Sequence, residues 1–159
     1  MKPFIIAVLS IILSTTVSGQ HKWLGGTGNY NDASMWNMGT VPTQNDDVII
    51  NGGTVVFPAG GTYEANSLIA ENCVLDFKGI VSSSAVIHIY ANLTLFNTTT
   101  TLYEFNSQST WDFKGSNTSH ELAAESVDLY ILKLDEESSE IVLRTSVVAS
   151  RSFGIISGT

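Results

Sequence analysis

The chain has 159 residues with 15 Asp and Glu against seven Lys and Arg, which gives a formal net charge of −8. Binding to nucleic acid or to anionic lipid requires basic patches, so this composition argues against both partners. The single cysteine, Cys73, excludes an internal disulfide. It lies in the apolar stretch "NCVLDF", where we expect a buried, unreactive thiol.

The first 19 residues have the pattern of a secretory signal peptide. Lys2 precedes the apolar run "FIIAVLSIIL", and Val17 and Gly19 occupy the −3 and −1 positions of a cleavage site before Gln20. The run is too short to span a membrane, which takes about 20 apolar residues. We therefore expect residues 1–19 to be removed. The mature chain should have no membrane span and should be secreted or held on the outer cell surface.

Residues 20–47 combine glycine, asparagine and aromatic residues, and we find no clear strand pattern before Val48. We expect this region to form an N-terminal cap of turns in which Trp23, Tyr30, Trp36 and Pro42 pack over the first coil of the fold. A second possibility is that Trp23, Trp36 and Trp111, with several tyrosines, form a platform on which sugar rings stack. Buried packing is the commoner role of such large side chains.

From Val48 onward, short β-type runs alternate with turns rich in Gly, Asn, Ser and Thr, such as "NGG", "PAGG" and "NTTTT". The expected strands are Val48–Ile50, Thr54–Phe57, Ser67–Ala70, Val74–Phe77, Val86–Tyr90, Leu93–Phe96, Leu102–Phe105 and Trp111–Phe113. The stretch from Glu121 to Leu134 has helical composition, but apolar and polar residues alternate in its second half. We expect its first few residues to form a loop or a single helical turn and its second half to form a strand. Further short strands should follow "DEESSE". Such an all-β pattern suits either a sandwich or a β-solenoid.

The stretch "WLGGTGNYNDASMWNMGTVPTQNDDVII" resembles the W-x-G-G-x-G-x-W/Y-x-D-x-x-x-W-x-x-G-x-x-P-x-x-x-D-x-V-x-I opening of exported bacterial β-helix proteins. The tail from Val127 to Thr159 resembles the repeated coil of exported proteins from Bacteroidetes. The matching opening positions are Trp23, Gly25, Gly26, Gly28, Tyr30, Asp32, Trp36, Gly39, Pro42, Asp46 or Asp47, Val48 and Ile50.

This resemblance implies an all-β, right-handed parallel β-helix, in which residues 48–159 form the coils. It also implies a secreted or cell-surface protein, often within a long chain that ends in a sorting domain for type IX secretion. No such sorting domain is recognisable, and the chain stops at "GIISGT" in mid-pattern. We therefore expect the coils to continue in a longer parent chain.

The expected function is a structural or adhesin-like segment without catalytic activity of its own, whose partners are surface glycans or other cell-surface proteins. Two alternatives stay open: a carbohydrate-binding module, and the N-terminal part of a polysaccharide-degrading β-helix enzyme. Repeats of this kind serve several functions, so the fold does not choose among them.

No catalytic motif is recognisable, and we expect no catalytic residue, cofactor or metal. His21, His88 and His120 lack the spacing of metal ligands, and His88 should face solvent from a strand. The segment "GGTGNY" resembles one calcium-binding nonapeptide, but Tyr30 replaces the aspartate and the motif occurs once. Because such sites need stacked repeats, turn glycines are the favoured interpretation.

Overall fold

The computed structural model describes residues 19–78, 85–102, 109–114, 119–124, 131–134 and 140–143. The expected signal peptide, residues 1–19, lies almost wholly outside the described residues. The described elements are short strands and one 3-10 helix, η1 (Ala33–Met35). The strands are β1 (Gln20–Lys22), β2 (Thr27–Asn29), β3 (Asp47–Asn51), β4 (Thr54–Phe57), β5 (Thr62–Ala65), β6 (Leu68–Glu71), β7 (Val74–Phe77), β8 (Ala85–Ile89), β9 (Leu93–Phe96), β10 (Thr99–Leu102), β11 (Ser109–Phe113), β12 (Ser119–Ala124), β13 (Ile131–Leu134) and β14 (Glu140–Leu143).

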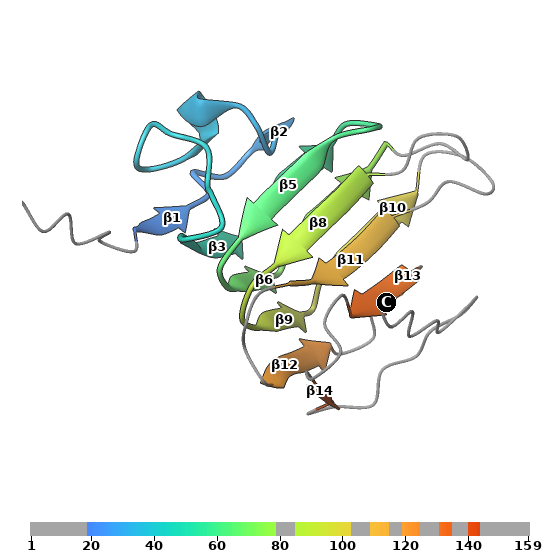
Figure 1. Cartoon of the computed structure of the whole chain (residues 1–159). Helices are drawn as coiled ribbons and strands as arrows, with labels where there is room; N and C mark the ends of the chain where they lie inside the picture. The colour runs from blue at the N-terminus through green and yellow to red at the C-terminus, as the bar shows by residue number, and fades with distance from the viewer. Residues whose placement is uncertain are drawn as a thin grey trace, which may run out of the picture.

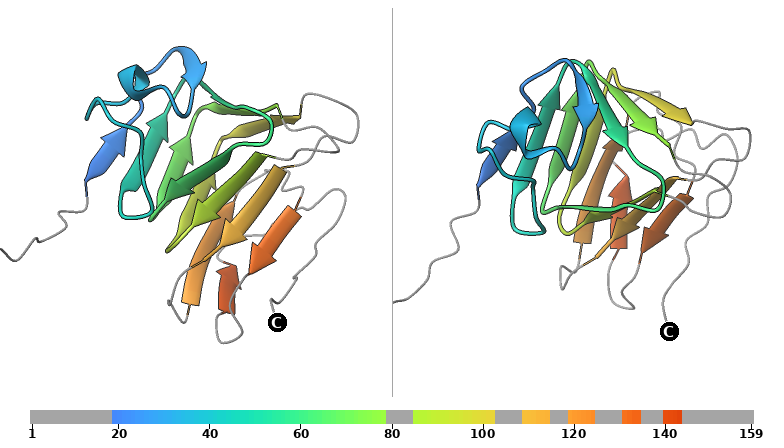
Figure 2. Two further views of the ribbon diagram at one scale, coloured as in Figure 1. Left: turned by 45° about the horizontal axis from the view of Figure 1, so that its top comes forward. Right: turned by 90° about the horizontal axis from the view of Figure 1, so that it is seen from above.

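These strands form three sheets in which every described pairing is parallel. The first sheet has the order β1-β3-β6-β9-β12-β14, the second β2-β4-β7-β10, and the third β5-β8-β11-β13. Consecutive strands therefore lie in different sheets, and each strand pairs with its counterpart one coil further along the chain. Figures 1 and 2 show this order as a progression of colour across each sheet. The expected all-β parallel β-solenoid is confirmed, and the sandwich is wrong.

Alternation along each strand explains why the coils stack. On the first sheet, Val48, Leu68, Leu93 and Leu122 occupy one inward column and are all buried. Equivalent positions face inward from the other two sheets, so one hydrophobic core runs through the solenoid. Because each short strand buries only about two side chains, the core exists only when several coils stack.

Aromatic rings continue this stacking inside the second sheet. Phe57 and Phe77 occupy the same position in adjacent coils, with ring centroids 4.8 Å apart and planes 11° from parallel. Tyr30 extends the column toward the N-terminus at 5.2 Å from Phe57. The ladder thus connects residue 30, in the expected cap, to the coils that follow.

The turn between the first and second sheets repeats one residue with a left-handed backbone conformation. Gly25, Gly52, Asn72 and Asn97 all have positive φ, at 92°, 83°, 50° and 46°. Only glycine and, less readily, asparagine adopt this left-handed region at low cost. Asn97 also donates a 2.7 Å hydrogen bond from Nδ2 to Oδ1 of Asn72, which joins two successive turns. The expected turn "NGG" is therefore a corner between two sheets.

Two strands precede Val48, where we expected only turns. β1 pairs with β3, and β2 pairs with β4, so residues 20–29 contribute to two of the three sheets. Their sequences, "QHK" and "TGN", have weak strand propensity. Pairing with a neighbouring coil overrides that preference, which depends strongly on context.

Three further expectations are corrected by the same argument. Thr62–Ala65 forms β5, which we did not predict, and Thr99–Leu102 forms β10 where "NTTTT" suggested a turn. Glu121 to Ala124 is not a loop or helical turn but part of β12, which pairs with β9 and β14. Leu122 is fully buried in that ladder.

Among the described residues, there is no helix that is long and apolar enough to cross a membrane.

Candidate functional site

The first coil differs from those that follow because it lacks a strand in the third sheet. After β2, residues 30–46 form η1 and an irregular loop, and β5 is the outermost strand of the third sheet on this side (Figure 1). Three of the residues expected in the cap, Trp23, Tyr30 and Trp36, lie in this coil and are buried, with 6%, 1% and 1% of their surface exposed.

The ring of Trp36 contacts the other two rings edge to face. The ring of Trp36 lies 5.1 Å from that of Trp23 and 5.0 Å from that of Tyr30. Its Nε1 donates a 2.7 Å hydrogen bond to the carbonyl oxygen of Tyr30. The Tyr30 hydroxyl in turn donates to the carbonyl oxygen of Glu64, at 2.7 Å. Burial raises the pKa of Tyr30 above its ordinary value, and the carboxylates of Asp46 and Glu64 add to the effect.

A cleft lies between the loop of the first coil and β5. Its volume is about 270 Å³, and Pro42 lines it while being buried itself. The cleft residues are Tyr30, Asn31, Val41, Pro42, Gly61, Thr62, Tyr63 and Glu64. The Tyr63 hydroxyl donates a 2.9 Å hydrogen bond to the carbonyl oxygen of Pro58, and burial raises the pKa of Tyr63 to about 12. The cleft occupies the place that a third-sheet strand of the first coil would fill.

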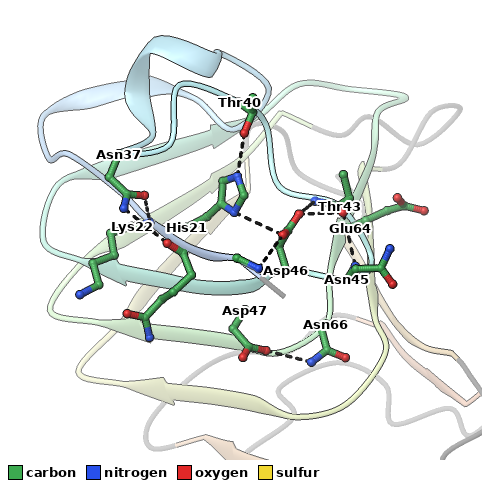
Figure 3. Close-up of polar contacts among 12 residues, drawn as sticks. His21, Lys22, Asn37, Thr40, Thr43, Asn45, Asp46, Asp47, Glu64 and Asn66 are labelled. Carbon is green, nitrogen blue, oxygen red and sulfur yellow. Dashed lines mark hydrogen bonds and ion pairs between the residues drawn. The ribbon is translucent and has the colours of Figure 1, made fainter. Parts of the chain in front are cut away.

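A polar cluster fastens the loop to β1 (Figure 3). His21 takes the inward position that Val48 and Leu68 take in later coils, and it is 4% exposed. Its Nε2 lies 3.0 Å from Oγ1 of Thr40, and its Nδ1 lies 3.7 Å from Oδ1 of Asp46. The loop therefore contacts the strand through both imidazole nitrogens.

Asp46 has further partners within the cluster. Its Oδ2 accepts hydrogen bonds from the N–H and the hydroxyl of Thr43, at 2.8 and 2.7 Å, and its Oδ1 accepts one from the N–H of Gly19, at 3.3 Å. Burial opposes ionisation of this carboxyl, but the bonds from Thr43, the nearby His21 and the bond from Gly19 together lower the pKa of Asp46.

The order hydroxyl, imidazole, carboxylate in Thr40, His21 and Asp46 is that of a nucleophilic triad. The geometry does not support that chemistry. The 3.7 Å separation of Nδ1 and Oδ1 exceeds a hydrogen bond, so the carboxylate does not orient the imidazole. The same carboxylate is committed to the backbone of its own loop. We conclude that the cluster holds the first coil together.

The outward face of the third sheet carries a second set of titratable side chains. Glu64, His88 and Asp112 occupy equivalent positions on β5, β8 and β11. His88 Nε2 lies 3.6 Å from Asp112 Oδ2, and Lys114 Nζ lies 3.5 Å from the same oxygen. His88 faces away from the core, as expected, but it is half-buried rather than open to solvent. The contact between His88 and Asp112 joins β8 to β11, whereas Lys114 follows Asp112 by two residues in the same segment of the chain.

The remaining candidates have packing roles. Cys73 is buried, as expected, and its Sγ lies 3.9 Å from the Thr98 hydroxyl; burial raises the pKa of its thiol. His120 is fully buried, with Nδ1 2.9 Å from the carbonyl oxygen of Ala91. Gly28 of the calcium-like motif lies in β2, where an added Cβ would meet the Met35 side chain. Among the described residues, no three His, Cys, Asp or Glu side chains form a metal-binding group.

The sequence did not indicate Thr40, Asp46, Glu64 or Asp112 as members of these clusters. Each is a common polar residue, and its partners include residues that are distant in sequence, such as His21 for Thr40 and Asp46 and His88 for Asp112. The alignment of Glu64, His88 and Asp112 depends on the register between three successive coils. No local motif reports that register.

The fold places the chain in the class of parallel β-solenoids, and the packed aromatic residues close the N-terminal side of its described core. Comparison with protein-family models, with curated proteins and with solved structures gave no match.

Proposed function

We propose that the protein is a structural or adhesin-like segment of a secreted or cell-surface protein. The observation that carries this proposal is the stacking of short parallel strands around one continuous core. Such arrays expose a long side surface of repeated outward positions, which suits a scaffold or a surface for partners. The pattern of residues 1–19 supports export, and the acidic composition supports an extracellular surface in contact with solvent.

The burial of the aromatic residues bears on the carbohydrate-binding alternative. Trp23, Trp36 and Trp111 are 6%, 1% and 0% exposed, so none presents a ring face on which a sugar could stack. The titratable cluster of Glu64, His88 and Asp112 would be the place to look for catalysis. The Asp112 carboxylate there is already in contact with His88 of the neighbouring strand and with Lys114 of its own segment. We therefore favour the structural role.

Location in the source cells tests the proposal. An epitope-tagged copy should be recovered from the medium or be cleaved by protease added to intact cells, and mass spectrometry should show loss of the first 19 or so residues. A control variant with Lys2 retained and charged residues placed within the run Phe4 to Leu13 should stay inside. An intact Met1 on a protein confined to the cytoplasm would refute export and with it the proposed role.

A further inference from the structure

We propose that the cleft beside β5 binds an extended peptide segment carrying a basic side chain, which adds to the third sheet as the strand missing from the first coil. This inference deepens the proposed function by naming a site and a class of partner. It rests on the backbone of β5, on the shape of the cleft and on the charge of its lining.

The outer edge of β5 has backbone groups available for pairing. The carbonyl oxygens of Gly61 and Ala65 accept from Val86 and Tyr90, so the odd-numbered residues face β8. In a parallel ladder the intervening residues Thr62 and Glu64 then face the opposite side, toward the cleft.

On that side, the carbonyl oxygen of Glu64 accepts from the Tyr30 hydroxyl, and the N–H of Asn66 bonds to the carbonyl oxygen of Asp46. Within the described part of the chain, the N–H and carbonyl of Thr62 and the N–H of Glu64 have no partner. Unpaired edge groups of this kind template the addition of another strand.

The cleft suits a short extended chain. It is lined by Gly61 to Glu64, from β5 and the residue before it, and by Asn31, Val41 and Pro42 of the first-coil loop. The backbone groups of Thr62 and Glu64 are two residues apart, about 6.6 Å along a strand, which matches about three residues of a partner. Neither set of lining residues lies outside the described part of the chain.

Charge selects the partner's side chain. Glu64 is one of the residues that line the cleft, its carboxylate accepts a 3.4 Å hydrogen bond from the Tyr90 hydroxyl, and the chain as a whole has a net charge of −8. A lysine or arginine flanked by β-branched residues would place its cation near that carboxylate, while the neighbours pack on Val41 and Pro42. A second copy of this acidic chain is a poorer occupant for the same reason.

Fluorescence anisotropy with the purified full chain and a labelled peptide, Thr-Val-Lys-Val-Thr, tests the proposal. We expect saturable binding that weakens about tenfold when the peptide backbone nitrogens are methylated, because methylation removes edge hydrogen bonds. Replacing the peptide lysine by glutamate should weaken binding about fivefold or more. Cellohexaose, a glucose oligomer, should not compete.

Protein variants locate the site. Thr62→Pro removes the N–H that faces the cleft at a position where an edge strand tolerates proline, and it should weaken peptide binding about tenfold. Glu64→Gln should weaken binding of the lysine peptide about fivefold but leave the glutamate peptide unaffected or slightly improved. Glu71→Gln, on β6 outside the cleft, is the matched control and should bind like the wild type. Circular dichroism and melting temperature must show that each variant is folded.

Several results would overturn the inference. These are no saturable peptide binding, equal binding of the methylated peptide, competition by cellohexaose, or an equal loss in Glu71→Gln and Glu64→Gln. None of them would alter where the protein is found in the cell, so failure here is distinguishable from failure of the proposed function. If Thr62→Pro does not fold, Glu64→Gln with the paired peptides still decides the matter.

Discussion

The indole of Trp36 joins the loop of the first coil to the solenoid core. It contacts the rings of Trp23, Tyr30 and His21, and its N–H is bonded to the Tyr30 carbonyl. On the polar side of the same coil, the Asp46 carboxylate accepts hydrogen bonds from the N–H groups of Thr43 in the loop and of Gly19 next to β1. Besides the strand pairings of β1 and β2, the loop of this coil is therefore held by one apolar and one polar side-chain cluster.

Replacing Trp36 by alanine should destabilise the protein strongly. Truncation of a buried Trp costs about 3–5 kcal/mol, which is a large part of the stability of an ordinary domain. Urea unfolding should show this loss for Trp36→Ala. Met38→Ala, two residues away at a side chain that is 56% exposed, is the matched control and should change stability by less than about 0.5 kcal/mol. Equal stability of the two variants would mean that the ring does not hold the first coil.

The carboxyl of Asp46 should make stability depend on acid pH. Because its pKa in the folded protein lies below the ordinary value of 3.8, the unfolded chain binds the proton first. The stabilisation that the Asp46 carboxylate contributes is complete well above pH 3.8, and it is lost as the pH falls toward the lowered pKa of the folded protein. The melting temperature of the wild type should therefore drop more steeply between about pH 5 and pH 3 than that of Asp46→Asn. Glu71→Gln, as a control, should retain the steep wild-type drop; parallel curves for wild type and Asp46→Asn would contradict the assignment.

At the scale of elements, the corners decide how closely successive coils approach. Gly52 and Gly53 follow β3 with φ of 83° and 80°. An added Cβ at Gly52 meets nothing within 4 Å, whereas one at Gly53 would collide with the Gly26 carbonyl of the preceding coil. The two neighbours thus share a backbone conformation but differ in their surroundings.

This difference predicts unequal effects of the same substitution. Gly52→Ala should cost about 1–2 kcal/mol, the strain of a side chain in the left-handed region. Gly53→Ala should cost clearly more, because the strain is joined by a clash with backbone that cannot move without separating β2 from β4. Chemical denaturation of both variants measures the difference. A smaller loss for Gly53→Ala would show that the first two coils are not in the contact described.

The strands also show what could be predicted from sequence. Three strands have the expected boundaries: Thr54–Phe57, Val74–Phe77 and Leu93–Phe96. In each, inward and outward side chains alternate, and turn residues flank the strand. β5 has the same alternation, with Tyr63 and Ala65 inward, but alanine and glutamate are weak strand formers and hide it. β1 and β2 have almost no local signal and exist through pairing with β3 and β4.

The register between successive coils of the whole molecule cannot be found in any local sequence pattern. Which side chains share a column depends on the number of residues in each coil, and those numbers vary. The aromatic residues of the first coil were predictable as packing residues from their size and spacing. The missing third-sheet strand, the cleft beside β5 and the alignment of Glu64 with His88 and Asp112 were not, because they follow from the register of the closed coils.

Amide hydrogen exchange followed by nuclear magnetic resonance tests the arrangement of the coils most directly. We expect slow exchange at Val48, Leu68, Val74 and Val86, whose N–H groups bond to the adjacent coil. Within β5, we expect slow exchange at Tyr63 and fast exchange at Thr62 and Glu64, which face the cleft. Two results would contradict the parallel solenoid with an incomplete first coil. One is slow exchange at Thr62 and Glu64 together with fast exchange at Tyr63, and the other is a set of cross-strand contacts typical of an antiparallel hairpin between β3 and β4.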